Sequence, residues 1–174
     1  MVNRRPVKAE HESVYISAFI DWHGRTFRSH YRVIARPDPP DAIIQSGRIT
    51  RWIEIGDVFW NDAWARDLYS FATPDETHRP IYSGIHVDMD EQFAGRFVRV
   101  LQDKLTKTSY RPVAKRYGPG YLVLAMMFPF FNQDTLLLMR RKWAATTPLS
   151  AGHFRGVFLA YPNASRFQRW RLAV

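Results

Sequence analysis

The chain has 174 residues, the usual size of one domain, and 46% of them are hydrophobic, which is enough for a packed core. It contains no cysteine, so disulfides, thiolate metal sites and a cysteine nucleophile are excluded. Lys and Arg number 25 against 16 acids, and the formal charge of +9 predicts a surface that attracts polyanions such as nucleic acid. A basic protein without such a ligand is the other interpretation, because charge alone does not identify a partner.

No linker, repeat or low-complexity segment divides the sequence, and we expect residues 1–174 to form a single domain. The basic residues 1–8 are not followed by an apolar signal core, and the longest apolar run, residues 121–131, is too short to span a bilayer. The sequence therefore predicts a soluble, cytoplasmic protein with no membrane partner.

The first elements expected are a helix and a region compatible with a strand. Apolar residues recur at helical spacing over residues 9–22, and Glu10 and Glu12 lie in what would be the first turn. The spacing of aromatic and branched residues over 26–35 is compatible with a strand. Three prolines then exclude regular structure from residues 36–40.

A β-hairpin is predicted next, with strands over residues 41–45 and 49–59 and a turn at Ser46-Gly47-Arg48 between them. Successive side chains of a strand point to opposite faces. In the second strand Ile49, Arg51, Ile53 and Ile55 therefore share one face, and Trp52, Glu54 and Gly56 share the other.

Two helices and a buried strand follow the hairpin. Asn61 is a good N-cap for a short helix to Phe71, and Asp88 with Glu91 offers a capping box for a helix to about Thr108. The buried stripe of that second helix comprises Phe93, Phe97, Val98, Leu101 and Leu105. Residues 121–128 have the continuous apolar character of a strand that is covered on both faces.

A helix from Asn132 to about Ala145 and two closing strands complete the predicted elements. The strands cover residues 156–161 and 167–172, around a turn at Pro162-Asn163. This order of elements favours an α/β fold with a mixed central β-sheet flanked by helices.

Two acidic residues of the predicted hairpin point to chemistry. Asp41 follows Pro40, and Glu54 lies thirteen positions later on the next strand. Carboxylates on adjacent strands can share a hard divalent cation such as Mg²⁺, which activates water and stabilises a phosphoryl transition state. The alternatives are a turn residue after proline for Asp41 and a partly exposed strand position for Glu54.

The segment PPDAIIQSGRITRWIEIG, residues 39–56, resembles the PD-(D/E)XK nuclease superfamily. The segments RFVRVLQDKLTKTSY and GYLVLAMMF are similar to the helix and strand that complete its core, so the resemblance covers about residues 10–128. It implies a restriction-endonuclease-like core, hydrolysis of nucleic-acid phosphodiesters, and Mg²⁺ or Mn²⁺ held by Asp41 and Glu54. Glu12 matches the extra carboxylate of the family's first helix, with Glu10 as the fallback. The alternative for both acids is a favourable interaction with the helix dipole.

The sequence departs from the family at Gly56, where a lysine is usual. Some members of the superfamily carry this lysine on the neighbouring helix, and Lys104 is the residue that matches it, with Lys107 as a weaker alternative. On a helical projection Lys104 falls between Phe93 and Phe97, inside the apolar arc. A carboxylate cluster beneath the helix would explain this position, and so would a stem lying on apolar surface with its ammonium in water.

Other groupings of polar residues have simpler explanations. His86, Asp88, Asp90 and Glu91 could bind a cation, although helix capping accounts for three of them. The last third of the chain alternates basic and aromatic residues, which suits a surface that contacts phosphates and stacks on bases, or ordinary amphipathic strands. These residues are Arg140, Arg141, Lys142, Arg155, Arg166, Arg169 and Arg171, with Trp143, Phe154, Phe167 and Trp170.

We therefore expect a Mg²⁺-dependent nuclease, in which Asp41 and Glu54 hold the metal, Glu12 assists and Lys104 positions the attacking water. The alternative is a catalytically inactive protein of the same fold that binds nucleic acid or a protein partner, for which the glycine at position 56 is the motive. A structural or assembly protein would instead show a large exposed apolar patch. A homodimer is among the assemblies that the sequence leaves open.

Overall fold

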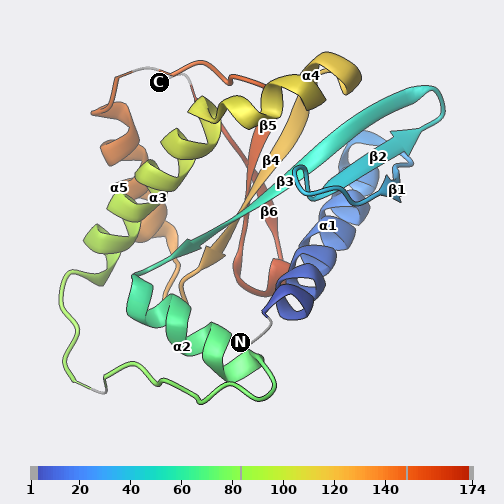
Figure 1. Ribbon diagram of the computed structural model, residues 1–174. Helices are drawn as coiled ribbons and strands as arrows, with labels where there is room; N and C mark the ends of the chain where they lie inside the picture. Colours follow the sequence, from blue (N-terminus) through green and yellow to red (C-terminus); the bar gives the residue numbers. More distant parts are fainter. Residues whose placement is uncertain (1–3, 83, 148, 173–174) are drawn as a thin grey trace.

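A six-stranded sheet in the order β1-β2-β3-β4-β5-β6 organises the chain (Figure 1). The computed structural model describes residues 4–82, 84–147 and 149–172, so both ends of the predicted domain, residues 1–3 and 173–174, lie outside the described part. The strands are β1 (Arg32–Ala35), β2 (Ala42–Ser46), β3 (Ile49–Phe59), β4 (Gly120–Met127), β5 (Phe154–Ala160) and β6 (Phe167–Trp170).

The sheet is mixed, as predicted. β1, β2 and β3 pair in antiparallel fashion, β3, β4 and β5 are parallel, and β6 returns antiparallel to β5. The parallel strands need crossover connections, which helices provide on the way from β3 to β4 and from β4 to β5. The fold is therefore α/β with a mixed sheet between helices.

Two layers of helices cover the two faces of the sheet. The helix α1 (Arg5–Phe27) packs on one face, while α3 (Met89–Thr106) and α5 (Gln133–Ala144) pack on the other (Figure 1). The remaining helices are α2 (Asp62–Ala72), α4 (Arg111–Tyr117), η1 (Thr108–Tyr110) and η2 (Pro162–Ala164). None of the described helices combines the length and the hydropathy needed to cross a membrane.

Most predicted elements are present, although several bounds differ. The hairpin turn comprises Gly47 and Arg48 only, because Ser46 belongs to β2. The largest differences lie at the amino terminus. The first helix begins at Arg5 rather than residue 9, so Glu10 and Glu12 are not in its first turn. The helix-dipole explanation of these two acids is therefore wrong. The helix also continues through Phe27, to a left-handed Arg28 with φ of 55°. Only Arg32–Ala35 of the expected strand over 26–35 is extended as a result.

Helix capping was predicted correctly at two of three positions. The side chains of Asn61 and Asn132 accept hydrogen bonds from the first turns of α2 and α5. The capping box at Asp88 is wrong, because this residue adopts a left-handed conformation with φ of 54° and its side chain caps nothing. Nearby, Asp90 instead accepts a hydrogen bond from Thr135, and Glu91 pairs with Lys142 at 2.5 Å.

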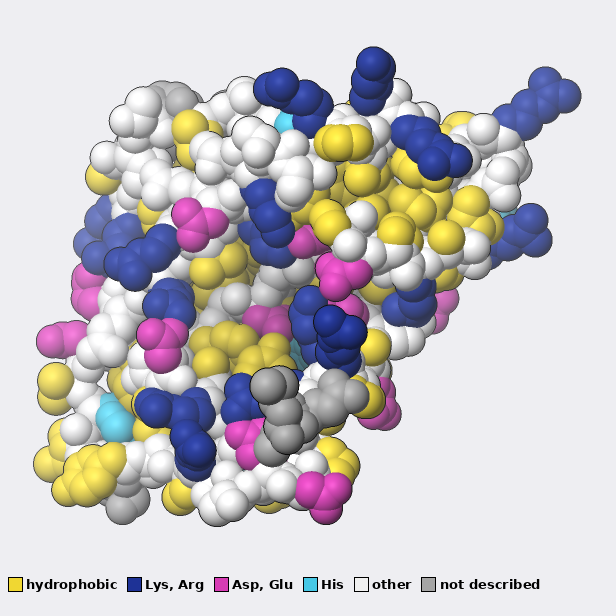
Figure 2. All heavy atoms as spheres, viewed as in Figure 1, with side chains coloured by type: hydrophobic (Ala, Val, Ile, Leu, Met, Phe, Trp, Pro, Cys, Tyr) yellow, Lys and Arg dark blue, Asp and Glu magenta, His cyan; other side chains and the backbone are white. Residues whose placement is uncertain are grey.

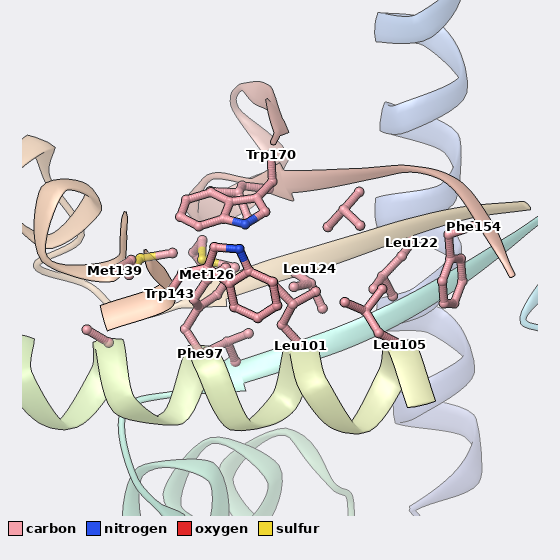
Figure 3. Close-up of a cluster of buried hydrophobic side chains, with 14 of the residues drawn as sticks. Phe97, Leu101, Leu105, Leu122, Leu124, Met126, Met139, Trp143, Phe154 and Trp170 are labelled. Carbon is pink, nitrogen blue, oxygen red and sulfur yellow. The ribbon is translucent and has the colours of Figure 1, made fainter. Parts of the chain in front are cut away.

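The two faces of β3 enter two different cores, as its alternation predicts. Ile53 and Ile55 pack under α1, whereas Trp52 belongs to the larger cluster beneath α3 and α5. Figure 3 shows part of this larger cluster, with Phe97 and Leu101 of α3 packed against Leu124 of β4.

The four aromatic residues predicted to stack on bases are core residues, which corrects that prediction. Trp143, Phe154, Phe167 and Trp170 are all buried. Three of them point into the larger cluster in Figure 3, where Trp143 and Trp170 lie close to each other. Amphipathic packing therefore accounts for the aromatic half of that alternating pattern.

Candidate active site

The hairpin places Asp41 and Glu54 side by side on the same face of the sheet. The register of β2 and β3 pairs Ala42 with Ile53, so the preceding residue, Asp41, stands opposite Glu54. The backbone N–H of Ile55 donates a 2.7 Å hydrogen bond to Asp41 Oδ2, which fixes that carboxylate beside β3. Both acids are buried, and both line one cavity of about 250 Å³.

The carboxylate of Glu54 is held from above by two residues of the helical layer. Lys104 Nζ donates to Glu54 Oε1 at 2.6 Å, and the hydroxyl of Tyr110 donates to the same oxygen at 2.8 Å. The other oxygen, Oε2, is buried and has no hydrogen-bond partner in the described part of the chain. A buried carboxylate oxygen without a partner is energetically unfavourable, so a ligand for a cation is a natural role for it.

Lys104 occupies the space that a side chain at position 56 would enter. A Cβ on Gly56 would lie 3.2 Å from Lys104 Cε and 3.8 Å from Lys104 Nζ. The same ammonium also donates to the Ile55 carbonyl at 3.1 Å. The lysine from α3 therefore reaches the position that a lysine on β3 would have served, and it does not snorkel away from the carboxylates.

Burial and like charge perturb Asp41. Desolvation is the larger cause and the neighbouring charge of Glu54 the second, and together they raise the pKa of Asp41 to about 7. The hydrogen bond from Ile55 and the charge of Lys104 act in the opposite direction but only partly offset this. A carboxyl group whose pKa is near 7 is partly protonated at neutral pH, and a nearby positive charge would favour its ionised form.

Glu12 lines the same cavity, from α1, and its carboxylate pairs with Lys8 at 3.2 Å. The fallback, Glu10, is exposed and is not among the residues that line the cavity. Within the described residues, no three His, Asp or Glu side chains are arranged to hold a metal. The structure thus brings Glu12 to the cavity without completing a three-carboxylate centre with Asp41 and Glu54.

Lys107, the weaker candidate for the missing lysine, also lines the cavity. Its ammonium is exposed and lies 5.2 Å from the centre of the Tyr110 ring, so it covers the residue that contacts Glu54. Figure 2 shows the resulting mixture of acidic and basic side chains in the depression that crosses this face of the molecule.

Sequence reasoning missed Tyr110 and a half-buried network around Asp57 of β3, which also lines the cavity. Asp57 accepts a hydrogen bond from the Tyr69 hydroxyl at 2.9 Å and contacts His11 Nε2 at 2.8 Å. Burial of the imidazole alone would lower the pKa of His11, but its hydrogen bond to Asp57 and the charge of that acid raise it. Although Asp57 lines the cavity, His11 and Tyr69 already engage its two carboxylate oxygens, so Asp57 is less available than Asp41 or Glu54 as a ligand.

The donor set around the cavity fits a hard divalent cation. Asp41 and Glu54 supply carboxylate oxygens, and Ile55 supplies a carbonyl oxygen beside them. Oxygen donors of this kind suit Mg²⁺ or Mn²⁺, which complete their coordination with water. Glu54 Oε2 has no hydrogen-bond partner in the described part of the chain, and the pKa of Asp41 is raised. Both observations indicate negative charge in the cavity that such an ion would neutralise.

Comparisons with known proteins identify no relative of this chain. No protein-family model, curated protein or solved structure matches the chain. The function is therefore argued from the side chains around the cavity.

Proposed function

We propose that this protein is a Mg²⁺- or Mn²⁺-dependent nuclease with a restriction-endonuclease-like core. The observation that carries the proposal is the convergence of Asp41, Glu54 and Lys104 on one cavity. The carboxylates come from neighbouring strands and the ammonium from a helix packed over them. This is the arrangement that the resemblance to PD-(D/E)XK nucleases implies, with the lysine moved from β3 to α3.

The chemistry would be hydrolysis of a phosphodiester. Water adds to phosphorus and one P–O ester bond breaks, which leaves a phosphate monoester and a free hydroxyl. A divalent ion bound by Asp41, Glu54 and the Ile55 carbonyl would lower the pKa of water and neutralise charge on the phosphate. Lys104 would orient the attacking water and balance the charge that develops on the phosphate oxygens. Tyr110 would keep Glu54 Oε1 in place, and Glu12 would act from the edge of the cavity.

The direct test is cleavage of labelled DNA and RNA, single-stranded and duplex, with Mg²⁺, with Mn²⁺ and with EDTA. We expect metal-dependent cleavage that falls by about a hundredfold or more in Glu54→Gln, because the substitution keeps the shape of the side chain and removes its charge. Glu91→Gln is the matched control, since Glu91 is a carboxylate in an exposed ion pair with Lys142. A wild-type protein that cuts none of these substrates with either metal would refute the nuclease.

A second function, binding of nucleic acid without cleavage, is favoured by one contact. Lys104 Nζ lies 2.6 Å from Glu54 Oε1, so the pair already balances its charge inside the protein. In that case Mn²⁺ does not bind, and Glu54→Gln leaves the affinity for nucleic acid unchanged. Calorimetric titration with Mn²⁺ separates the two functions, because the nuclease requires binding that Glu54→Gln weakens.

A further inference from the structure

The net positive charge of the chain is concentrated at its carboxyl-terminal end. All sixteen acidic residues lie at or before Asp134, and none lies in residues 135–174. Seven of the 25 Lys and Arg residues fall in that last segment, so it carries +7 of the +9 formal charge. A charge distribution this uneven produces a positive electrostatic potential around one part of the surface, which attracts polyanions there.

The fold gathers these cations around the last two strands of the sheet. An open groove of about 1050 Å³ runs along α5, β5 and β6, and four arginines line it, namely Arg140, Arg155, Arg169 and Arg171. Among the residues that the structure describes, no acid lines the groove. All four arginines are exposed, and within residues 4–82, 84–147 and 149–172 none of their guanidinium groups forms an ion pair or a hydrogen bond.

The basic surface continues past the ends of β5 and β6 onto the α1 side of the sheet. Arg155 and Arg169 also line a second hollow of about 330 Å³, together with Arg51 and the exposed ring of Phe27. Because the two hollows share these arginines, their surfaces meet. A ligand that occupies both hollows would reach from α5 to the end of α1 and could contact the arginines that line each of them.

The groove suits an extended phosphate chain better than a small anion. Its volume exceeds that of most small-molecule sites, which hold about 300–1,000 Å³. Guanidinium groups bind phosphate oxygens through paired hydrogen bonds. The tryptophans of the groove wall, Trp143 and Trp170, are buried in the core and offer little surface to a base (Figure 3). Contacts would therefore go to the backbone of the nucleic acid and not to its sequence.

We infer that this arginine groove binds the phosphodiester backbone of a nucleic-acid strand, at a site separate from the carboxylate cavity. The two sites share no lining residue. The choice of a nucleic acid as the polyanion rests on the proposed function, whereas the groove itself does not. It would hold a part of the substrate that flanks the bond to be cut.

Binding of this kind has a characteristic salt dependence. Each phosphate neutralised on a single strand contributes about −0.7 to the slope of log K against log salt concentration. Four arginines therefore predict a contribution of about −3 to that slope. Removing three of them reduces the slope by about 2 and weakens binding at moderate salt by about tenfold or more.

The test is fluorescence anisotropy of labelled 20-mer oligonucleotides titrated with the full chain in EDTA, so that no cleavage takes place. The groove variant carries Arg155→Gln, Arg169→Gln and Arg171→Gln. The matched control removes the same charge from exposed arginines elsewhere, with Arg48→Gln, Arg66→Gln and Arg99→Gln. Circular dichroism and thermal melting confirm that both variants are folded before their affinities are compared.

We expect the groove variant to bind about tenfold more weakly than the wild type with a shallower salt slope, and the control variant to lose at most about a third of that effect in log K. Equal losses in the two triple variants would overturn the inference, because net charge alone would then explain them. Competition by millimolar inorganic phosphate at low micromolar oligonucleotide would also overturn it, in favour of a small-anion site. So would groove-dependent binding to vesicles rich in anionic lipid with none to oligonucleotides.

The result is distinguishable from a failure of the nuclease. Binding is measured in EDTA and cleavage with Mg²⁺ or Mn²⁺, so each readout can fail without the other. If the wild type never cleaves but its binding still depends on the three arginines, the result supports the arginine groove and refutes the nuclease. If cleavage occurs and the groove variant binds normally in EDTA, the result refutes the arginine groove and supports the nuclease.

Discussion

The side chain of Lys104 fills the space next to Gly56, since a Cβ on Gly56 would lie 3.2 Å from Lys104 Cε. The ammonium of Lys104, on α3, reaches Glu54 Oε1 at 2.6 Å, and in the proposed nuclease it replaces a lysine at position 56. An exchange of the two positions tests this relationship. Lys104→Ala should lower cleavage by about a hundredfold or more, and adding Gly56→Lys should restore part of it. The measurement is the initial rate with saturating Mn²⁺.

The exchange needs one accommodation, because a Cβ at position 56 would also lie 2.9 Å from Leu124 Cδ2. Where the double variant does not fold, ethylammonium added to Lys104→Ala supplies the missing group from solution and should raise the rate. Lys107→Ala is the control, since Lys107 lines the cavity but contacts Tyr110 and not Glu54. A folded Lys104→Ala variant that cleaves at the wild-type rate would show that the ammonium has no part in the reaction.

Tyr110→Phe should destabilise the protein with less effect on cleavage than Lys104→Ala. The change removes a 2.8 Å hydrogen bond to a buried carboxylate, and bonds to charged groups contribute about 1.5–3 kcal/mol. Burial, with the charge of Glu54 beside it, raises the pKa of Tyr110, so its hydroxyl remains a donor across the working range. Urea unfolding measures the difference. Tyr117→Phe, on the neighbouring α4, should change the free energy of unfolding by less than half as much.

The hairpin and its paired acids could be predicted because a strand has a strict alternation of faces. The turn has two residues, Gly47 and Arg48, rather than the predicted three, and it pairs Ser46 with Ile49. This register places Asp41 opposite Glu54 on one side of the sheet, whereas a three-residue turn would have placed Asp41 opposite Ile53. The direction of Lys104 followed from the 3.6-residue period of a long helix with a clear apolar stripe. These are local periodicities, which the sequence predicts more reliably than the exact ends of the strands.

Tyr110 could not be predicted in the same way. It lies in η1, a single turn between α3 and α4, and one turn carries no period from which to infer the direction of a side chain. The arginine and aromatic residues of β5 and β6 show a further limit. The alternation of a strand places Arg169 and Trp170 on opposite faces of β6. The sequence does not show which face α5 packs against, and therefore which of the two side chains is buried. The sequence could therefore suggest the basic surface but placed buried tryptophans on it.

Asp41→Asn should stabilise the protein above neutral pH. The pKa of Asp41 is about 7 in the folded state and near its ordinary value of 3.8 in the unfolded chain. The folded state therefore holds this proton more tightly, so the stability it contributes is complete below about pH 4 and is lost as the pH rises through 7. We expect Asp41→Asn to be more stable than the wild type by about 2 kcal/mol at pH 8, and by much less at pH 4.

Urea unfolding of the two proteins at several pH values measures this difference. Asp103→Asn, an exposed acid on α3, serves as the control and should show no such pH dependence. A wild type and an Asp41→Asn variant whose stabilities differ equally at pH 4 and pH 8 would mean that Asp41 ionises normally in the folded protein. Any loss of cleavage in Asp41→Asn would then need a different explanation from the charge of this carboxyl.

Metal binding should depend on pH in the opposite sense to the stability of the free protein. A divalent ion in the cavity must displace the proton of Asp41, so its apparent affinity should fall by up to about tenfold for each pH unit below 7. Thermal melting with a fixed Mn²⁺ concentration should therefore show a larger rise in Tm at pH 8 than at pH 6. In Asp41→Asn the rise should be smaller and the same at both pH values, because no proton then competes. A wild-type Tm that Mn²⁺ raises equally at pH 6 and pH 8 would place the ion away from Asp41.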